Sequence, residues 1–234
     1  QLYVNATEAT RVIYAGHYAG LCYTTDGKTH QCTGDVAMMR SIPGMHVVYP
    51  AFSEEVPAIL NWYIREKPPG PLYIRLHRTP RALPAPSGGI AFTPGHGLAL
   101  RRTDTQRAVV TAGPHMAGAC LEAADCLARD GQNLEVYAVA SHTHVAPGFV
   151  RALAEQYTEL FIVEELAPQG GLFDEIMRQI SNLRCNETAL SVPVVYHRAA
   201  EGFPCSTREP EGLYRRFGLD RKTITTWLRS VVET

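Results

Sequence analysis

The feature that most constrains the fold of this 234-residue chain is an alternation of short apolar runs with helix-like stretches, separated by prolines and glycines. Strands that alternate with helices form parallel sheets, because each helix carries the chain back to the start of the next strand. The sequence therefore predicts an α/β fold. The expected strands are residues 11–16, 46–50, 72–76, 108–113, 134–140, 160–165 and 192–196, and the expected helices are 35–41, 53–66, 114–130, 148–157, 170–181 and 219–232.

Prolines and glycines also divide the chain into two parts. They are frequent from Thr79 to Gly97, where no hydrophobic periodicity is visible. We expect a first unit at residues 1–84, a linker at 85–97 and a second domain at 98–234. Ser53, followed by two glutamates, is expected to cap the second helix of the first unit.

The amino-acid composition indicates which classes of ligand and which cellular compartment to expect. A formal net charge of -1 and a pI near 6.8 provide no field that would attract nucleic acid or an anionic membrane. The expected ligands are small molecules and other proteins. The six cysteines form no CxxC pair, and no apolar run is long enough to cross a bilayer. We expect reduced thiols in a cytoplasmic protein.

The loop from Thr25 to Gln31 carries the residues best suited to chemistry. Asp26 and His30 lie four positions apart around a glycine and can converge on one polar ligand. An imidazole can pass protons to hydroxyl groups near neutral pH, and a carboxylate can orient a hydroxyl. Taken alone, such a loop is more often a turn whose side chains satisfy one another.

A longer pattern around this loop resembles a known family. Asp26-Gly-x-Thr-His-Gln, Asp35-x-Ala-x-Met-Arg-Ser-Ile-Pro-Gly-Met-x-Val and Gly70-Pro-Leu-Tyr-Ile-Arg-Leu-His-Arg are similar to the second half of the pyrimidine-binding domain of transketolases and 1-deoxyxylulose-5-phosphate synthases. Val109-Val-Thr-Ala-Gly, Pro147, Val163-Glu-Glu and Gly170-Gly-Leu resemble the transketolase C-terminal domain, a pattern shared with beta subunits of 2-oxoacid dehydrogenases. The whole resembles the C-terminal subunit of split transketolases.

The resemblance implies roles for several residues. His30 would lie over the thiazolium end of thiamine diphosphate and transfer protons at the hydroxyl of the donor sugar, and Asp26 would hold that hydroxyl. Arg78 would bind a terminal phosphate, with a surface ion pair as the alternative. Arg75 is expected to serve packing or an ion pair.

Two departures from the family concern the substrate. Lys28 stands where the family usually has proline, and we interpret it as a solvated loop charge. Eight residues before Asp26, where transketolases often have a phosphate-binding histidine, this chain has Tyr18 with His17 beside it. His17 and Tyr18 are therefore candidate substrate-binding residues. A phosphate-free or unusual acceptor is an alternative to a sugar phosphate.

The family also needs parts that this sequence does not contain. The glutamate that activates thiamine and the aromatic pocket for its ring precede the Asp-Gly-x-Thr-His segment, and a separate domain binds the pyrophosphate and Mg²⁺. Half a parallel sheet would expose a strand edge and an apolar face. We therefore expect an N-terminal transketolase subunit or segment as a partner, assembled as a heterotetramer, with the metal held by that partner.

Three functions remain open at this stage. The first is transfer of a two-carbon ketol unit from a ketose to an aldose by the assembled enzyme. The second is an activity on a 2-oxo acid, like that of 1-deoxyxylulose-5-phosphate synthase or a dehydrogenase beta chain. The third is a non-catalytic scaffold or regulatory half.

Overall fold

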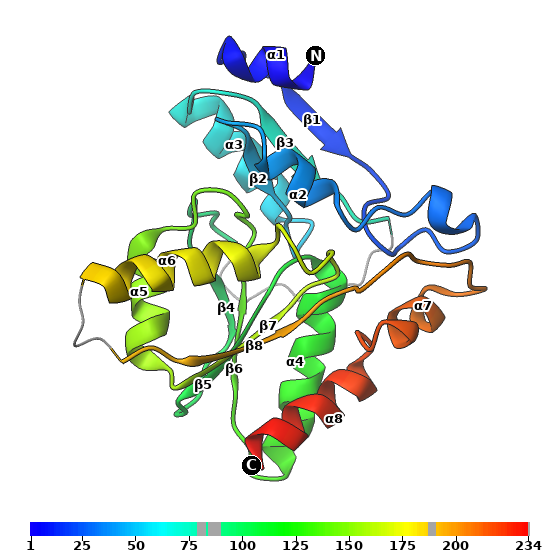
Figure 1. Cartoon of the computed structure of the whole chain (residues 1–234), viewed down its shortest axis with the longest axis vertical. Helices are drawn as coiled ribbons and strands as arrows, with labels where there is room; N and C mark the ends of the chain where they lie inside the picture. Colours follow the sequence, from blue (N-terminus) through cyan, green and yellow to red (C-terminus); the bar gives the residue numbers. More distant parts are fainter. Residues whose placement is uncertain (79–82, 84–89, 187–190, 234) are drawn as a thin grey trace.

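The computed structural model of the chain describes residues 1–78, 83, 90–186 and 191–233. Two sheets, each with its own helices, lie one above the other (Figure 1). The expected α/β fold with parallel sheets is confirmed. We call residues 1–78 the N-terminal unit and residues 98–233 the C-terminal unit.

The N-terminal unit is built on a three-stranded sheet of order β1-β3-β2, in which every pairing is parallel. Val36 shares an apolar cluster with Val47 and Tyr73 on one face of the sheet. Ile59 shares another with Leu72 on the opposite face. One helix therefore covers each face. The elements are α1 (Leu2–Thr7), β1 (Ile13–Gly16), the 3-10 turn η1 (Gly27–Thr29), α2 (Asp35–Arg40), β2 (His46–Val48), α3 (Glu55–Glu66) and β3 (Leu72–Arg75).

The C-terminal unit has a five-stranded sheet of order β4-β6-β5-β7-β8, in which only β4 is antiparallel. Helices α4 and α8 cover one face and α5 and α6 the other. The elements are β4 (Leu98–Arg101), β5 (Arg107–Thr111), α4 (Pro114–Arg129), β6 (Glu135–Ala138), α5 (Pro147–Gln156), β7 (Glu159–Val163), α6 (Leu172–Asn186), β8 (Val194–Arg198), α7 (Pro210–Arg216) and α8 (Arg221–Val232).

The two units are joined along β2. The backbone N–H of Tyr49 donates to the carbonyl of Ala140 at 2.7 Å, and that of His142 donates to the carbonyl of Val47 at 2.8 Å. The free side of β2 is thus covered by a segment of the C-terminal unit. The outer side of β1 has no strand partner among the described residues, and Ile13 there is 41% exposed.

Several local predictions are wrong. Ser53 does not cap α3, which begins at Glu55. The Ser53 hydroxyl donates to Glu54 Oε2 at 2.9 Å, and the buried Glu55 carboxylate accepts hydrogen bonds from the N–H groups of Ala51 and Phe52, which precede the helix. The short elements α1, β4 and α7 were not predicted from the sequence.

The domain boundaries stay a prediction. The expected boundary at residue 84 and the linker residues 85–89 lie outside the described residues. The second domain was expected to begin at Leu98, where β4 begins. No helix in the described part of the chain is both long and apolar enough to cross a membrane.

Candidate functional site

The candidate residues lie where β1 and β3 end. Both strands run in the same direction, so His17 and Tyr18 leave the sheet at the same edge as His77 and Arg78. In open α/β sheets, ligands bind at the carboxyl ends of the strands. The loop with Asp26 and His30 continues from the end of β1 and belongs to the same region.

Asp26 and His30 flank the single turn η1. Gly27 has a φ of +77°, a conformation that favours glycine, and this turn brings His30 Nε2 to 4.0 Å from Asp26 Oδ2. The two side chains are 54% and 44% exposed, so neither is turned into the core. The hydroxyl of Thr29 lies 3.0 Å from His30 Nδ1. The imidazole is therefore oriented by its own loop and still accessible to a ligand.

Arg78 stacks on two aromatic rings. Its guanidinium carbon lies 5.1 Å from the ring centre of Tyr18 and 4.8 Å from that of Tyr23. The Tyr23 ring in turn lies 5.9 Å from the His30 ring. Tyr18 has a φ of +58°, which a bulky residue rarely adopts and which costs energy unless its surroundings hold it. The candidate residues for substrate binding and for proton transfer thus form one connected cluster.

Two neighbouring cavities open at this cluster. One of about 540 Å³ is lined by His17, Tyr18 and His30, together with Tyr23 and Asp35. Asp26 is not among the residues that line it.

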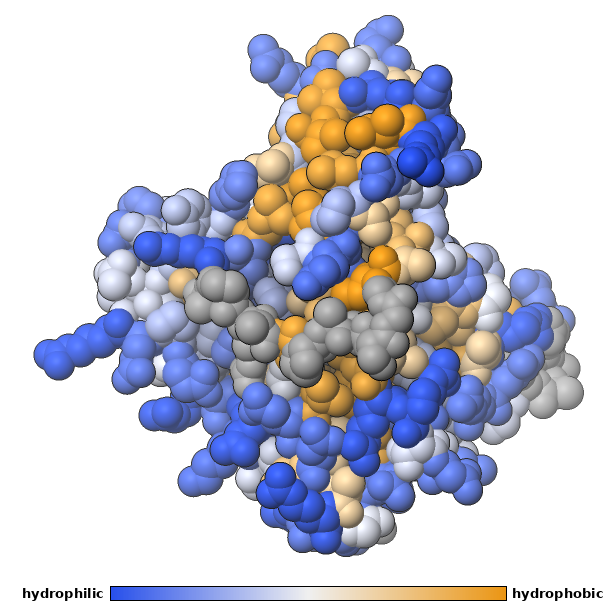
Figure 2. Space-filling model, turned by 180° about the vertical axis from the view of Figure 1, so that it is seen from behind, coloured by the Kyte–Doolittle hydropathy of each residue, from blue (hydrophilic) through white to orange (hydrophobic). Residues whose placement is uncertain are grey.

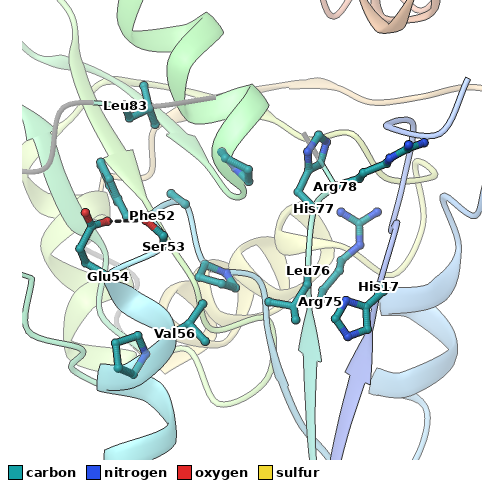
Figure 3. A pocket seen from close by; sticks show the side chains of 14 residues that line it. His17, Phe52, Ser53, Glu54, Val56, Arg75, Leu76, His77, Arg78 and Leu83 are labelled. Carbon is teal, nitrogen blue, oxygen red and sulfur yellow. Dashed lines mark hydrogen bonds between the residues drawn. The ribbon is translucent and has the colours of Figure 1, made fainter. Parts of the chain in front are cut away.

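The second cavity, of about 660 Å³, lies on the other side of His17. In Figure 3, His17, His77 and Arg78 occupy one side of it, and Phe52 and Glu54 from the start of α3 face them. His17, at the end of β1, therefore borders both cavities, whereas His77 and Arg78, which follow β3, border only the second.

A buried ionic cluster beneath these cavities was not anticipated in full. Arg75 is fully buried, and its guanidinium donates to Asp35 Oδ2 and Glu165 Oε1, both at 2.9 Å. The expectation of an ion pair at Arg75 is confirmed, but its partners lie in different units. Burial opposes the negative charge, yet the neighbouring His77 and Arg75 and the Tyr214 hydroxyl hold the pKa of Glu165 well below its usual value.

The preceding residue, Glu164, is equally buried but serves the C-terminal unit alone. Its carboxylate accepts from the N–H groups of Leu172 and Phe173 at the start of α6 and lies 3.0 Å from His197 Nε2. Burial lowers the pKa of the nearby His142 to about 4, although the charge of Glu164 acts in the opposite direction. In the sequence, the feature that points to both buried carboxylates is the pair of acids directly after an apolar strand, because a charge placed next to the core must be paired or hydrogen-bonded.

No metal site is evident in the part of the chain that the structure describes. In that part, no three side chains of His, Cys, Asp or Glu gather closely enough to hold a metal ion.

Comparisons with known proteins agree with this fold. A family model described as "Transketolase, pyrimidine binding domain" matches residues 2–81, and one described as "Transketolase, C-terminal domain" matches residues 95–224. The chain is 26% identical over 233 residues to "Transketolase-like protein 1" of Bos taurus, covering 96% of this chain and 36% of that protein. It is 30% identical over 231 residues to "1-deoxy-D-xylulose-5-phosphate synthase" of Magnetococcus marinus, covering 94% and 34%.

Among solved structures, "Split gene transketolase, inactive beta4 tetramer" aligns with a TM-score of 0.77 and 26% identity, covering 95% of this chain and 67% of that one. The chain thus spans about a third of the length of these two curated relatives and two-thirds of the split subunit. The first family model matches the residues that form the three-stranded sheet, and the second matches those that form the five-stranded sheet. With the fold of the thiamine-diphosphate-dependent enzymes, this chain belongs to the transketolase family.

Proposed function

We propose that this chain is the C-terminal component of a thiamine-diphosphate-dependent enzyme that transfers a two-carbon ketol unit from a ketose to an aldose. The observation that carries the proposal is the cluster at the ends of β1 and β3. There the acid and imidazole of one loop lie beside an arginine that packs against two tyrosine rings. These groups provide proton transfer, hydroxyl binding and anion binding in one place.

His30 would move a proton at a hydroxyl of the donor sugar, and Asp26 would accept a hydrogen bond from that hydroxyl. The 4.0 Å between the two side chains leaves them close enough to contact adjacent atoms of one substrate. Thiamine diphosphate, when bound, supplies the carbanion chemistry that ketol transfer needs. In this arrangement the protein positions the sugar and handles its protons.

Arg78 would bind the anionic end of the acceptor. Its planar fork matches a phosphate or a carboxylate, and the rings of Tyr18 and Tyr23 restrict its orientation before a ligand arrives. His17 borders both cavities and would add a second donor. A phosphorylated aldose is the acceptor that these groups suit best.

A partner that completes the N-terminal sheet is part of the proposal. Of the eight large hydrophobic side chains that are most exposed among the described residues, six belong to the N-terminal unit. Figure 2 shows hydrophobic residues gathered over that unit, in the upper part of the molecule. The six residues are Tyr3, Val4, Ile13, Tyr18, Met38 and Ile64.

We propose that an N-terminal transketolase subunit, or an upstream segment, pairs with the outer side of β1 and covers this surface, giving a heterotetramer. It would also supply the activating glutamate, the aromatic pocket and the site for pyrophosphate and Mg²⁺. The solved "Split gene transketolase, inactive beta4 tetramer" is consistent with a need for such a partner. A cytoplasmic location fits the reduced thiols and stays part of the proposal.

The test is reconstitution with the N-terminal subunit, followed by assay of ketol transfer between sugar phosphates. His30→Ala should lower turnover by about 10²- to 10⁴-fold while leaving the affinity for thiamine diphosphate nearly unchanged. Lys28→Ala on the same exposed loop is the matched control and should retain turnover. Lost cofactor affinity with normal residual turnover in His30→Ala would contradict the proposal.

A second candidate is an activity on a 2-oxo acid. It is favoured by the 30% identity to a 1-deoxy-D-xylulose-5-phosphate synthase. Release of carbon dioxide from pyruvate by the reconstituted protein, without sugar-to-sugar transfer, would establish this activity instead. If the reconstituted protein does neither, the chain is a scaffold or regulatory half.

A further inference from the structure

We infer that Glu165, a residue of the C-terminal unit, is a positioning residue that fixes both arms of the substrate-facing cluster of the N-terminal unit. The two arms are the turn 17–20 that follows β1 and the segment 76–78 that follows β3. The inference rests on the proposed function for its kinetic consequence. Its structural part concerns only this chain.

Glu165 lies two residues beyond β7 and is 1% exposed. Its Oε1 accepts hydrogen bonds from the Tyr49 hydroxyl at 2.7 Å and from Arg75 Nη1 at 2.9 Å. Its Oε2 accepts from the Tyr214 hydroxyl and lies 3.7 Å from His77 Nε2. Three of these four partners, Tyr49, Arg75 and His77, belong to the N-terminal unit. A buried carboxylate with this many donors has a single favoured position.

The segment after β3 is held from two sides. Arg75 is the last residue of β3, and its guanidinium also lies 4.3 Å from the Tyr49 ring centre. His77 Nε2 lies 3.0 Å from the Tyr214 hydroxyl, which itself donates to Glu165. Arg78 follows directly, so the residues that Glu165 contacts determine where the arginine leaves the sheet.

The turn after β1 rests on the same ion pair. Gly20 has a φ of +69°, and a Cβ at this position would lie 2.2 Å from Glu165 Oε1 and 2.6 Å from Arg75 Nη2. Only a glycine permits this approach. Two residues earlier, Tyr18 is held at its strained φ of +58° and places its ring against Arg78. The backbone N–H of Ala19 donates to the carbonyl of Leu76, which connects the turn to the other arm.

The negative charge of Glu165, and not only its volume, is what this arrangement requires. A neutral amide would remove one of the two carboxylates that pair with Arg75, and would offer the donors of Tyr49, Arg75 and Tyr214 one good acceptor atom instead of two. The backbone of Gly20 would then lie against a weaker pair. We expect the turn with Tyr18 to relax from its strained conformation and to release Arg78.

The experiment compares Glu165→Gln with Glu164→Gln in the full chain by NMR of the Arg78 guanidinium and the Tyr18 ring. Glu164 is the matched control because it is adjacent and equally buried, but among the described residues its carboxylate bonds to the start of α6 and to His197, all in the C-terminal unit. Glu165→Gln should move the chemical shifts of both groups towards those of an unconstrained arginine and tyrosine. Glu164→Gln should leave both chemical shifts unchanged. Unchanged signals in both variants, or equal changes in both, would overturn the inference.

Tyr214→Phe provides a second variant if Glu165→Gln does not fold. It removes one hydrogen bond to Glu165 and keeps the ring stacked on His115, whose ring centre is 3.4 Å away. The same two signals should shift in the same direction by a smaller amount. A Tyr214→Phe spectrum identical to that of the parent would count against the role of Glu165.

In the reconstituted enzyme, Glu165→Gln should raise KM for the anionic acceptor about tenfold while changing kcat by less than about twofold. A shift in the NMR signals without any ketol transfer in the parent enzyme would reject the proposed function and retain the positioning role. If the parent enzyme transfers the ketol unit and Glu165→Gln lowers kcat and kcat/KM equally, the positioning role is rejected and the function is retained.

Discussion

The two sheets differ in how completely the chain encloses them. In the C-terminal unit, the central strands β5 and β7 lie between two layers of helices, and their inner residues are fully buried. In the N-terminal unit, β3 is buried at every position, whereas β1 alternates between exposed and half-buried residues. Both faces of the C-terminal sheet are therefore covered by its own helices, whereas the N-terminal sheet borders the C-terminal unit on one side and, among the described residues, is open on the other.

On one side that material is visible. The segment from Ala140 to His142 pairs with β2, and Glu165 pairs with Arg75. On the other side, the outer edge of β1 is where we place the partner. The difference indicates that the N-terminal unit depends on contacts with the C-terminal unit for its stability, and it is the basis of the proposal that another chain or segment completes its sheet.

The substitution with the largest expected effect on this dependence is Arg75→Met. The change leaves Asp35 and Glu165 buried without their shared cation, so we expect the free energy of unfolding to fall by about 4 kcal/mol. Hydrogen exchange should show β1 and β3 opening while β5 and β7 stay protected. Arg229→Ala, which removes an exposed ion pair with Asp130, should cost about 0.5 kcal/mol or less. Equal opening of both sheets would refute the dependence.

Acid should loosen the same junction through His142. Burial lowers its pKa to about 4 from 6.5, with Glu164 opposing the shift and Arg40 and Arg75 adding to it. Between these values the unfolded chain binds a proton that the folded chain does not, so stability falls as the pH drops from about 6.5 to about 4. The loss is roughly 3 kcal/mol for this shift.

His142→Gln should flatten this part of the curve of unfolding free energy against pH. Denaturant titrations at a series of pH values measure it. An unchanged slope in the variant would show that other groups cause the acid sensitivity.

The sequence predicted the alternation that gives both parallel sheets, because the buried strands are short apolar runs and the stretches between them have helical spacing. It also identified the loop of Asp26 and His30, because the residue types and the family pattern coincide there. It could not predict the burial of Arg75, whose partner Glu165 is ninety residues away and comes close only through packing of the two units. The cap of α3 was mistaken because the Ser53 hydroxyl donates to the adjacent Glu54 carboxylate and, among the described residues, accepts no hydrogen bond from the first turn of the helix.

The open edge of β1 can be tested with Ala15→Pro. The carbonyls of Val12 and Gly16 accept from the N–H groups of Leu72 in β3 and of Leu76 just after it, so alternation turns the backbone groups of Ala15 to the outer side. Proline there removes a donor needed by an added strand and none used by β3. We expect binding of the N-terminal subunit to weaken roughly 30-fold, or by about 2 kcal/mol, in a titration followed by light scattering. The stability of the chain alone should change little.

The control is Val195→Pro on the outer side of β8, the edge strand of the other sheet. Since the proposal places no partner there, its affinity for the N-terminal subunit should match that of the parent. If Val195→Pro weakens binding as much as Ala15→Pro does, the partner does not select the β1 edge.

The smallest expected effect comes from the closed unit. Asp220 caps α8 by accepting from the N–H groups of Lys222 and Thr223, so Asp220→Ala should lower the free energy of unfolding by about 1 kcal/mol. Asp220→Asn keeps an acceptor and should lose less. Neither change should alter the affinity for the N-terminal subunit, because α8 packs on α4, within the C-terminal unit. Ala15→Pro should therefore lower the affinity for the N-terminal subunit without changing the free energy of unfolding, and Asp220→Ala should do the reverse. A loss of affinity in Asp220→Ala would show that partner binding and the stability of the chain are coupled.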